Sequence, residues 1–408
     1  MAMEFGRNFF WGAATSAHQV EGNNTNNDWW AWENASGGRV RSLAACRHYD
    51  LYKEDFDLAR ELGHNCHRLS LEWSRVEPEP GKFSEEEIAH YRGVLDALKE
   101  RGIEPVVTLH HFTSPVWFMQ MGGWLNQKAR HYFLHFAEKM ANEFAKDVKF
   151  WVTINEPTIY AYYGYLVGDW PPQERSLLKA KAVLDNLSAT HIRAYRLIHD
   201  IYKRNDLAAP MVSISANLQA FEYCRPTLAN KLAVYLRNKF FNLYFIDRLV
   251  ARRSLDYIGL NYYGRSLVDV RKAGITHLFM DVCQDNHLPL KKNSLGWDIY
   301  PLGLYKLLMQ LKKYKLPVLI TENGICTEDD SLRWEYIQGH LQETLRAAAD
   351  GANVIGYIYW SLLDNFEWDK GFGPRFGLVH VDYNDYKRTI RESARRLADV
   401  CKTGRIPL

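Results

Sequence analysis

Two glutamates follow strongly apolar segments and are the residues best placed to do chemistry. Glu156 comes after the run WVTIN, and Glu322 comes after VLIT. A carboxylate has no packing reason to end an apolar run, because acidic residues are almost never fully buried unless they are paired. One such residue is usually an ion-pair partner. Two carboxylates that face one pocket can cleave a glycosidic bond, since one protonates the leaving oxygen and the other attacks the anomeric carbon.

The glutamate pair requires a framework that brings both residues to one place. Eight short apolar runs alternate with amphipathic helical patterns, which is typical of parallel strands buried on both faces. We therefore expect the α/β class and a (β/α)8 TIM barrel, with residues 1–408 forming a single domain. The predicted strands are Phe9–Ala14, Cys66–Leu71, Glu104–Leu109, Phe150–Asn155, Met211–Asn217, Tyr257–Asn261, Val318–Glu322 and Ile355–Trp360.

Helix signals separate these strands. Ser84, with Glu87 three residues later, forms a capping box, and Gly102 ends that helix. A doubly wound open sheet is the structural alternative, but it would usually have a glycine-rich phosphate loop after its first strand. Neither GxGxxG nor GxxxxGK[ST] occurs, so nucleotide chemistry is disfavoured. The other predicted helices are Tyr49–Leu62, Asn126–Ala145, Ser176–Tyr202, Thr227–Val250, Leu302–Tyr314, Leu332–Ala349 and Thr389–Cys401.

In a barrel, chemistry gathers at the carboxyl ends of the strands. Glu156 ends the fourth predicted strand and Glu322 the seventh, so both should face the mouth of the barrel. The other strand ends are also rich in polar and aromatic residues. These are His18, Gln19 and Glu21 after strand one, Arg68 and Glu72 at strand two, His110 and His111 at strand three, Asn155 at strand four, Asn217 at strand five, Asn261, Tyr262 and Tyr263 at strand six, and Trp360, Asp364, Asn365, Glu367 and Trp368 at strand eight.

The composition is that of an ordinary globular chain with an excess of aromatic residues. Hydrophobic residues make up 47% and charged residues 24%, which excludes a disordered or fibrous protein. The 51 basic and 48 acidic residues give a net charge of +3, too balanced to favour nucleic acid or an acidic membrane surface. Aromatic residues reach 14%, with 13 Trp and 24 Tyr. Such amphipathic rings suit sugar ligands.

The sequence also bears on the cellular location and on cofactors. The first residues lack the basic start and long apolar run of a secretory signal, and no window approaches the roughly 20 apolar residues of a membrane span. The six cysteines show no CxxC and no metal spacing, so we expect free thiols or small buried side chains. We predict a cytoplasmic protein with no metal, no cofactor, no nucleic-acid partner and no membrane partner. The oligomeric state is left open.

The segments that carry these residues resemble glycoside hydrolase family 1, the retaining β-glucosidase and β-galactosidase family of (β/α)8 barrels. The resemblance spans essentially the whole chain, with its motifs in the right order. The matching strings are FFWGAATSAHQVEG at 9–22, NCHRLSLEWSR at 65–75, LHHF at 109–112, TINEP at 153–157, GLNYYG at 259–264, GWDIYP at 296–301, VLITENG at 318–324 and YWSLLDNFEW at 359–368.

The resemblance implies catalytic roles for five residues. Glu322 would be the nucleophile, and Glu156 would be the acid/base. Arg68 and Tyr263 would lie beside Glu322 and favour its ionised form by charge and by a hydrogen bond. Asn155 would bind the sugar 2-hydroxyl. In a retaining enzyme the two carboxyl groups should lie about 5–5.5 Å apart.

The resemblance also implies a sugar site. Polar side chains would bind the hydroxyl groups, and an indole would cover the ring face. A carboxylate at Glu367 would repel a phosphate, which favours an unphosphorylated sugar. The same residues accept either epimer at carbon 4, so the preference for glucosides or galactosides stays open. The implied substrate-binding residues are Gln19, His111, Asn155, Trp360, Glu367 and Trp368, with Phe376 shaping the same pocket and Trp297 lining the aglycone side.

We therefore expect a retaining, exo-acting β-glycosidase for terminal unphosphorylated β-D-glucosides, and for galactosides or fucosides, with possible transglycosylation. Its partner would be a small β-glycoside or an oligosaccharide. The alternative is a catalytically impaired sugar-binding relative of the same fold, although such relatives usually lack one of the two glutamates. An inverting hydrolase would separate its carboxylates by roughly 6.5–9.5 Å. An aldolase would need a strand-end lysine, which no predicted strand has.

The sequence departs from the family pattern in the loops that would surround the mouth. The stretches from Asn34 to Cys46 and from Tyr263 to Trp297 are short, and Phe112 stands where many members have Trp. We expect a more open mouth and a tolerant aglycone site. Several other residues of interesting type are expected to be core or wall residues. They are Trp11, Trp73, Trp124, Trp151 and His110.

Overall fold

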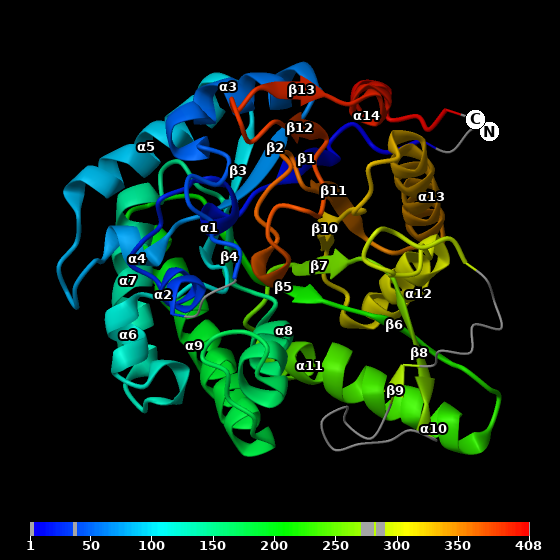
Figure 1. Ribbon diagram of the computed structural model, residues 1–408, viewed down its shortest axis with the longest axis horizontal. Coiled ribbons are helices and arrows are strands. Elements are labelled where there is room, and N and C mark those ends of the chain that lie inside the picture. Colours follow the sequence, from blue (N-terminus) through cyan, green and yellow to red (C-terminus); the bar gives the residue numbers. More distant parts are fainter. Residues whose placement is uncertain (1–3, 36–38, 271–280, 283–289, 408) are drawn as a thin grey trace.

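Eight parallel strands form a closed barrel surrounded by helices (Figure 1). The structure is a computed structural model and describes residues 4–35, 39–270, 281–282 and 290–407. The strand order around the barrel is β1-β11-β10-β7-β5-β4-β3-β2, so the first and last barrel strands are neighbours. The predicted α/β class and TIM barrel are confirmed. The barrel strands are β1 Phe10–Ala14, β2 Cys66–Ser70, β3 Glu104–His110, β4 Phe150–Asn155, β5 Met211–Asn217, β7 Ile258–Tyr262, β10 Val318–Asn323 and β11 Val354–Trp360.

The strands form where the sequence has continuous apolar runs. Every residue of β4 and of β10 is buried, as expected for a parallel sheet that is covered by side chains on one face and by helices on the other. Each predicted strand is present, and each of its ends lies within one residue of the observed end.

Helices cover the outside of the barrel. Ser84 caps α5 by accepting a hydrogen bond from the backbone N–H of Glu87, and Gly102 follows that helix with a positive φ of 68°. Both features match the predicted signals. The main outer helices are α3 His48–Glu61, α5 Glu85–Glu100, α7 Ala129–Phe144, α9 Leu177–Arg204, α12 Pro301–Leu311, α13 Asp330–Ala349 and α14 Glu392–Thr403.

Two predicted helices differ from the structure. The helix expected over Thr227–Val250 is divided into α10 Leu228–Arg237 and α11 Tyr244–Ala251 by a π-helical turn at 238–243. The helix expected from Thr389 begins at Glu392, because residues 388–390 form strand β13 and pair with β12 Val379–Val381. Local pairing therefore overrides helix propensity at this end of the chain.

Additional elements extend beyond the carboxyl ends of the barrel strands, and the sequence did not predict them. A three-stranded sheet follows β5 and β7 and contains β6 Ala220–Tyr223, β8 Arg265–Asp269 and β9 Asp281–Val282. Figure 1 shows α10 lying beside this sheet, away from the barrel. The short helices on the barrel loops are α1 Ala17–Val20, α2 Asp28–Asn34, α4 Trp73–Val76, α6 Val116–Gln120 and α8 Pro157–Ala161.

The core contains the aromatic residues that were assigned to it. Trp11, Trp73, Trp124 and Trp151 are buried. Burial also lowers the pKa of His110 to about 3, so this histidine is an uncharged core residue. Most of the aromatic excess therefore serves packing.

The cysteines follow the sequence prediction with one exception. Cys46, Cys66, Cys326 and Cys401 are free thiols, whereas Cys224 is disulfide-bonded. The expectation of unpaired cysteines is therefore wrong at Cys224, because spacing in the sequence does not reveal which segments meet in space.

Parts of the two short mouth segments lie outside the described residues, at 36–38, 271–280 and 283–289. No helix in the described part of the chain is long and apolar enough to cross a membrane.

Candidate active site

The strand register aligns polar residues at the carboxyl ends of four neighbouring strands. Glu322 on β10 pairs with Asn261 on β7, and Asn261 pairs with Asn217 on β5. Asn155 on β4 pairs with Ser215 on β5. Glu156 follows with a φ of 44°, in the left-handed region, so the chain turns sharply before Pro157 begins α8. These ends bring both glutamates to one level of the barrel.

A cavity of about 690 Å³ lies at these strand ends, within the size range of small-molecule sites. It gathers both glutamates and nearly all the residues implied by the motifs. Arg68 is the exception, because it lies behind Glu322 and is 1% exposed. The implied residues that line the cavity are Gln19, His111, Asn155, Glu156, Tyr263, Trp297, Glu322, Trp360, Glu367, Trp368 and Phe376.

Glu322 is held by donors on both carboxylate oxygens. Arg68 donates from Nη1 to Oε1, and Tyr263 donates from Oη to Oε2 over 2.5 Å. Arg68 is itself fixed, since its Nη2 donates to Asn155 Oδ1 at 2.6 Å and its Nε to Thr108 Oγ1 at 3.2 Å. Burial raises the pKa of Tyr263 well above its usual value, so the phenol keeps its proton and remains a donor. Such contacts favour the ionised carboxylate of Glu322.

Glu156 has a different environment. Its Oε1 accepts hydrogen bonds from Asn261 Nδ2 at 2.8 Å and from Asn217 Nδ2 at 3.0 Å. Burial, and secondly the charge of Glu322, raise the pKa of Glu156 to about 8, although the two amides and Arg68 oppose the rise. At neutral pH this carboxyl group holds a proton. The two carboxyl groups therefore lie in different environments, one held by a guanidinium and a phenol and the other by two amides.

Asn155 links the two glutamates to His111. Its Oδ1 accepts from Arg68 and from Asn261, which leaves its Nδ2 facing His111 Nε2 at 3.2 Å. Burial, and then the charge of Arg68, lower the pKa of His111 well below its usual range. The neutral ring can therefore accept this hydrogen bond on Nε2, which places its own N–H on Nδ1.

The far end of the cavity combines amide, carboxyl and aromatic groups. Gln19 Nε2 donates to Glu367 Oε2 at 3.2 Å. Burial and the charge of Glu322 raise the pKa of Glu367 to about 8, so at neutral pH this residue is mostly protonated. The ring of His111 stacks on two indoles, with its centroid 5.9 Å from that of Trp360 and 6.1 Å from that of Trp368. Hydrogen-bonding groups and flat apolar faces thus lie side by side, which suits a polar ring ligand.

The outer wall of the cavity is aromatic. Trp297 is 40% exposed, and its ring lies 5.9 Å from Tyr263 and 6.3 Å from Phe376. It therefore stands at the open side of the cavity, whereas the less exposed Trp360 and Trp368 lie deeper.

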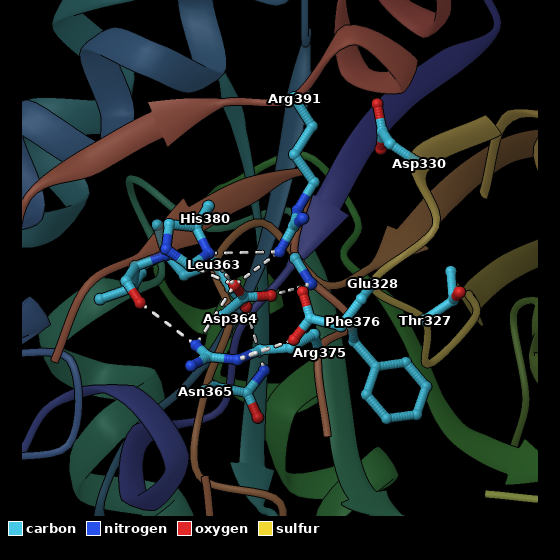
Figure 2. Close-up of polar contacts among 12 residues, drawn as sticks. Thr327, Glu328, Asp330, Leu363, Asp364, Asn365, Arg375, Phe376, His380 and Arg391 are labelled. Carbon is cyan, nitrogen blue, oxygen red and sulfur yellow. Dashed lines mark hydrogen bonds and ion pairs between the residues drawn. The ribbon is translucent and has the colours of Figure 1, made fainter. Parts of the chain in front are cut away.

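The segment after β11 carries Glu367, Trp368 and Phe376, and Asp364 anchors it (Figure 2). Asp364 is fully buried. Its Oδ2 accepts from Arg391 Nη2 at 2.8 Å and from Arg375 Nη1 at 3.4 Å, and its Oδ1 accepts from the backbone N–H of Gly377 at 2.9 Å. Figure 2 shows the ring of Phe376 pointing away from this cluster. One buried carboxylate thus fixes the loop from its outer side.

Several residues of the cavity give no sequence signal that would assign them to it. Asn217 stands at a strand end but gives no other signal, and Gln219 lies outside the strand. Arg265 and Leu267 belong to the small sheet, which no periodicity predicted. The further lining residues are Phe112, Ile159, Tyr163, Asp169, Trp170, Asn217, Gln219, Gly264, Arg265, Ser266, Leu267, Lys292, Leu295, Gly296, Asp298, Asp369 and Lys370.

Comparison with known proteins assigns the family. The family model described as glycosyl hydrolase family 1 matches residues 1–252 and 246–405. The chain belongs to this family. The family resemblance inferred from the motifs is therefore confirmed, and the protein is a glycoside hydrolase of the β-glycosidase type.

Relatives with this fold share both the sequence pattern and the three-dimensional structure. Beta-glucosidase A of Thermotoga maritima is 30% identical, and the match covers 98% of each chain. A beta-galactosidase of Pyrococcus woesei is 29% identical over 96% of this chain and 95% of its own. The solved beta-glycosidase of Pyrococcus horikoshii is 39% identical with a TM-score of 0.93, covering 100% of this chain and 97% of its own.

A ligand complex is also among the similar structures. The Thermotoga maritima beta-glucosidase in complex with glucoimidazole superposes with a TM-score of 0.92 at 29% identity, covering 99% of this chain and 100% of its own.

Proposed function

We propose that this protein is a retaining, exo-acting β-glycosidase that removes terminal, unphosphorylated β-D-glucosyl units. The observation that carries the proposal is the unequal environment of two glutamates in one cavity. Glu322 is surrounded by donors that favour its anion, whereas burial and the charge of Glu322 keep Glu156 protonated at neutral pH. A nucleophile and an acid are the two groups that double displacement requires.

In the first step, an oxygen of Glu322 attacks the anomeric carbon while the bond from that carbon to the leaving oxygen breaks. Glu156 transfers its proton to the leaving oxygen, so the aglycone departs as a neutral alcohol. The product is a glycosyl ester of Glu322. Asn155 would bind the sugar 2-hydroxyl, a contact that strengthens in the transition state.

In the second step, Glu156 acts as the base. Ester formation removes the negative charge of Glu322, which is one of the causes that raise the Glu156 pKa, so the proton of Glu156 is released more easily. Glu156 then takes a proton from water, the water oxygen attacks the anomeric carbon, and the carboxylate of Glu322 leaves. An alcohol in place of water gives transglycosylation.

The sugar specificity is part of the proposal. Gln19, His111, Glu367 and Trp368 would bind hydroxyl groups above Trp360. Relatives named beta-glucosidase and beta-galactosidase support activity on both epimers at carbon 4, and fucosides would fit the same site. Because Glu367 is mostly protonated at neutral pH, charge repulsion alone does not exclude a phosphate there. The preference for unphosphorylated sugars is therefore proposed from the family resemblance at Glu367 alone.

The aglycone side is proposed to be tolerant. Trp297, Leu267 and Leu295 line the cavity and offer apolar contact that does not depend on one particular aglycone. We also propose that the chain is a single catalytic domain. A cytoplasmic location remains a prediction: the four free thiols favour it, whereas a disulfide such as the one at Cys224 is rare in the cytosol.

The test uses the Glu322→Gly variant and an aryl β-glucoside. We expect the variant to be inactive, and added azide to restore turnover with an α-glucosyl azide as product. The Glu156→Ala variant is the matched control, for which azide should give the β-anomer through the intact nucleophile. Normal activity of Glu322→Gly would refute the mechanism. A sugar-binding relative without catalysis would show no wild-type turnover across a panel of glucosides, galactosides and fucosides.

A further inference from the structure

Two amide groups donate to one and the same oxygen of Glu156. Asn217 and Asn261 each direct Nδ2 to Oε1, at 3.0 and 2.8 Å. Within the described part of the chain, Oε2 accepts no hydrogen bond, yet it is not one of the buried atoms without a partner. Because Glu156 lines the cavity, Oε2 is the oxygen left to face a ligand.

Independent contacts fix the orientation of both amides. Asn261 Oδ1 accepts from Thr321 Oγ1 at 2.7 Å. Asn217 Oδ1 accepts from Gln219 Nε2 at 3.1 Å. A flip of either amide would place its carbonyl oxygen against Glu156 and its NH2 against a donor, so both flips are disfavoured.

The side-chain amide of Asn242, a residue that is 1% exposed, fixes the backbone of Gln219. The backbone N–H of Gln219 donates to Asn242 Oδ1 at 3.0 Å, and its backbone carbonyl accepts from Asn242 Nδ2 at 2.9 Å. Asn242 belongs to the π-helical turn at 238–243. A chain of hydrogen bonds therefore runs from this turn through Gln219 and Asn217 to the glutamate.

We propose that Asn217, held in place by Gln219, is a positioning residue that keeps Oε1 of Glu156 as an acceptor and thereby places the transferable proton on Oε2. A carboxylic acid carries its proton on one oxygen only, and a proton on Oε1 would oppose two amide N–H groups. This inference rests on the proposed acid/base role of Glu156. It adds which oxygen exchanges the proton and which residues determine it.

The same geometry serves both steps of the reaction. In the first, the Oε2–H bond breaks as the proton passes to the leaving oxygen, and Oε1 remains hydrogen-bonded to the two amides. In the second, Oε2 takes a proton from the attacking water. Since the amides also stabilise the anion, they oppose the effect of burial on the Glu156 pKa and make the base available after the glycosyl ester has formed.

The test compares Asn217→Ala and Gln219→Leu with wild type. For phenyl β-glucoside, whose leaving group needs a proton, we expect the alkaline limb of the kcat/KM profile of Asn217→Ala to move up by roughly 0.5–1 pH unit, because a donor to the anion is lost. For dinitrophenyl β-glucoside, whose turnover is limited by the second step, kcat should fall roughly three- to tenfold. Azide should restore it, since azide needs no base.

Gln219→Leu should shift both readouts in the same direction by a smaller amount, because Asn217 is still present but can flip. Gln338→Leu is the matched control, since it removes a glutamine amide on α13 outside the cavity and should leave both profiles unchanged. Thermal unfolding of each variant separates misfolding from the predicted effect.

A fall in kcat of Asn217→Ala without a shifted alkaline limb and without azide response would overturn this inference. Failure of the proposed function would give a different result. If Glu156 were not the acid/base, Glu156→Ala itself would give no β-glycosyl azide.

Discussion

Asp364 pairs with Arg391 and Arg375, and the loss of stability on removing its charge can be worked out from the structure. The change is Asp364→Asn, which preserves shape but removes the charge opposite Arg391 and Arg375. Removing one partner of a buried ion pair typically costs about 3–5 kcal/mol, since the other charge is left without compensation. Both guanidinium groups are partly solvated, with side-chain exposures of 11% and 19%. We therefore expect the lower end of the range, about 3 kcal/mol.

That loss converts into a change of Tm. An unfolding entropy of about 2.1 cal/mol/K per residue, applied to 408 residues, amounts to roughly 0.86 kcal/mol/K. A loss of about 3 kcal/mol should then lower Tm by roughly 3–4 °C, measurable by scanning calorimetry. Because Asp364 anchors the segment with Glu367 and Phe376, KM for a glucoside should rise more than kcat falls.

A double variant sharpens this test. Adding Arg391→Gln removes one of the two cations that Asp364→Asn leaves without a partner, so Asp364→Asn should cost less in that background than in wild type. If Asp364→Asn melts within about 1 °C of wild type and binds glucosides equally well, the cluster does not position the loop and the reasoning is wrong.

Four further predictions follow from the cavity. First, kcat/KM of the wild type should fall as pH rises through about 8, because glycosylation needs protonated Glu156; a flat profile up to pH 10 would contradict the assigned acid. Second, Glu322→Gln removes a charge that raises the Glu156 pKa, so a carboxyl titration followed by infrared difference spectroscopy should move to lower pH. Third, Trp297→Ala should raise KM for aryl glucosides several-fold while kcat with dinitrophenyl β-glucoside stays within about twofold; equal losses in both would place Trp297 at the reacting sugar. Fourth, the folded-state pKa of Glu367 is about 8 against an ordinary 4.5, so the native state binds more protons and its stability falls as pH rises between these values. Glu367→Gln should flatten that fall in denaturant titrations, and an unchanged slope would argue that Glu367 titrates normally.

The barrel was predictable because its signals are local. The β10 run VLITEN is buried at every position, and a continuous apolar run bounded by turn residues predicts such a strand to within a residue. Glu156 and Glu322 were predictable for the same reason, since each ends a run of this kind.

The supporting residues depend on pairings between distant segments. Asn217 became a site residue only when the β5–β7 register set it opposite Asn261, and Gln219 only through Asn242 in an unforeseen π-helical turn. The sheet that carries Arg265 brings together segments separated by more than forty residues. No periodicity within one window records such partners, because they are determined by tertiary packing.

The closure of the barrel between β1 and β11 has a consequence for synthesis on the ribosome. Gln19 and Glu367, 348 positions apart, meet only after the last barrel strand has left the exit tunnel. Until then the amide of Gln19 lacks its carboxyl partner, and the sheet ends at the free edges of β1 and β10, which only β11 joins. Chains truncated before residue 354 should therefore have an open sheet edge exposed to chaperones and proteases. The newly made enzyme can acquire its sugar site only as one of the last events of folding.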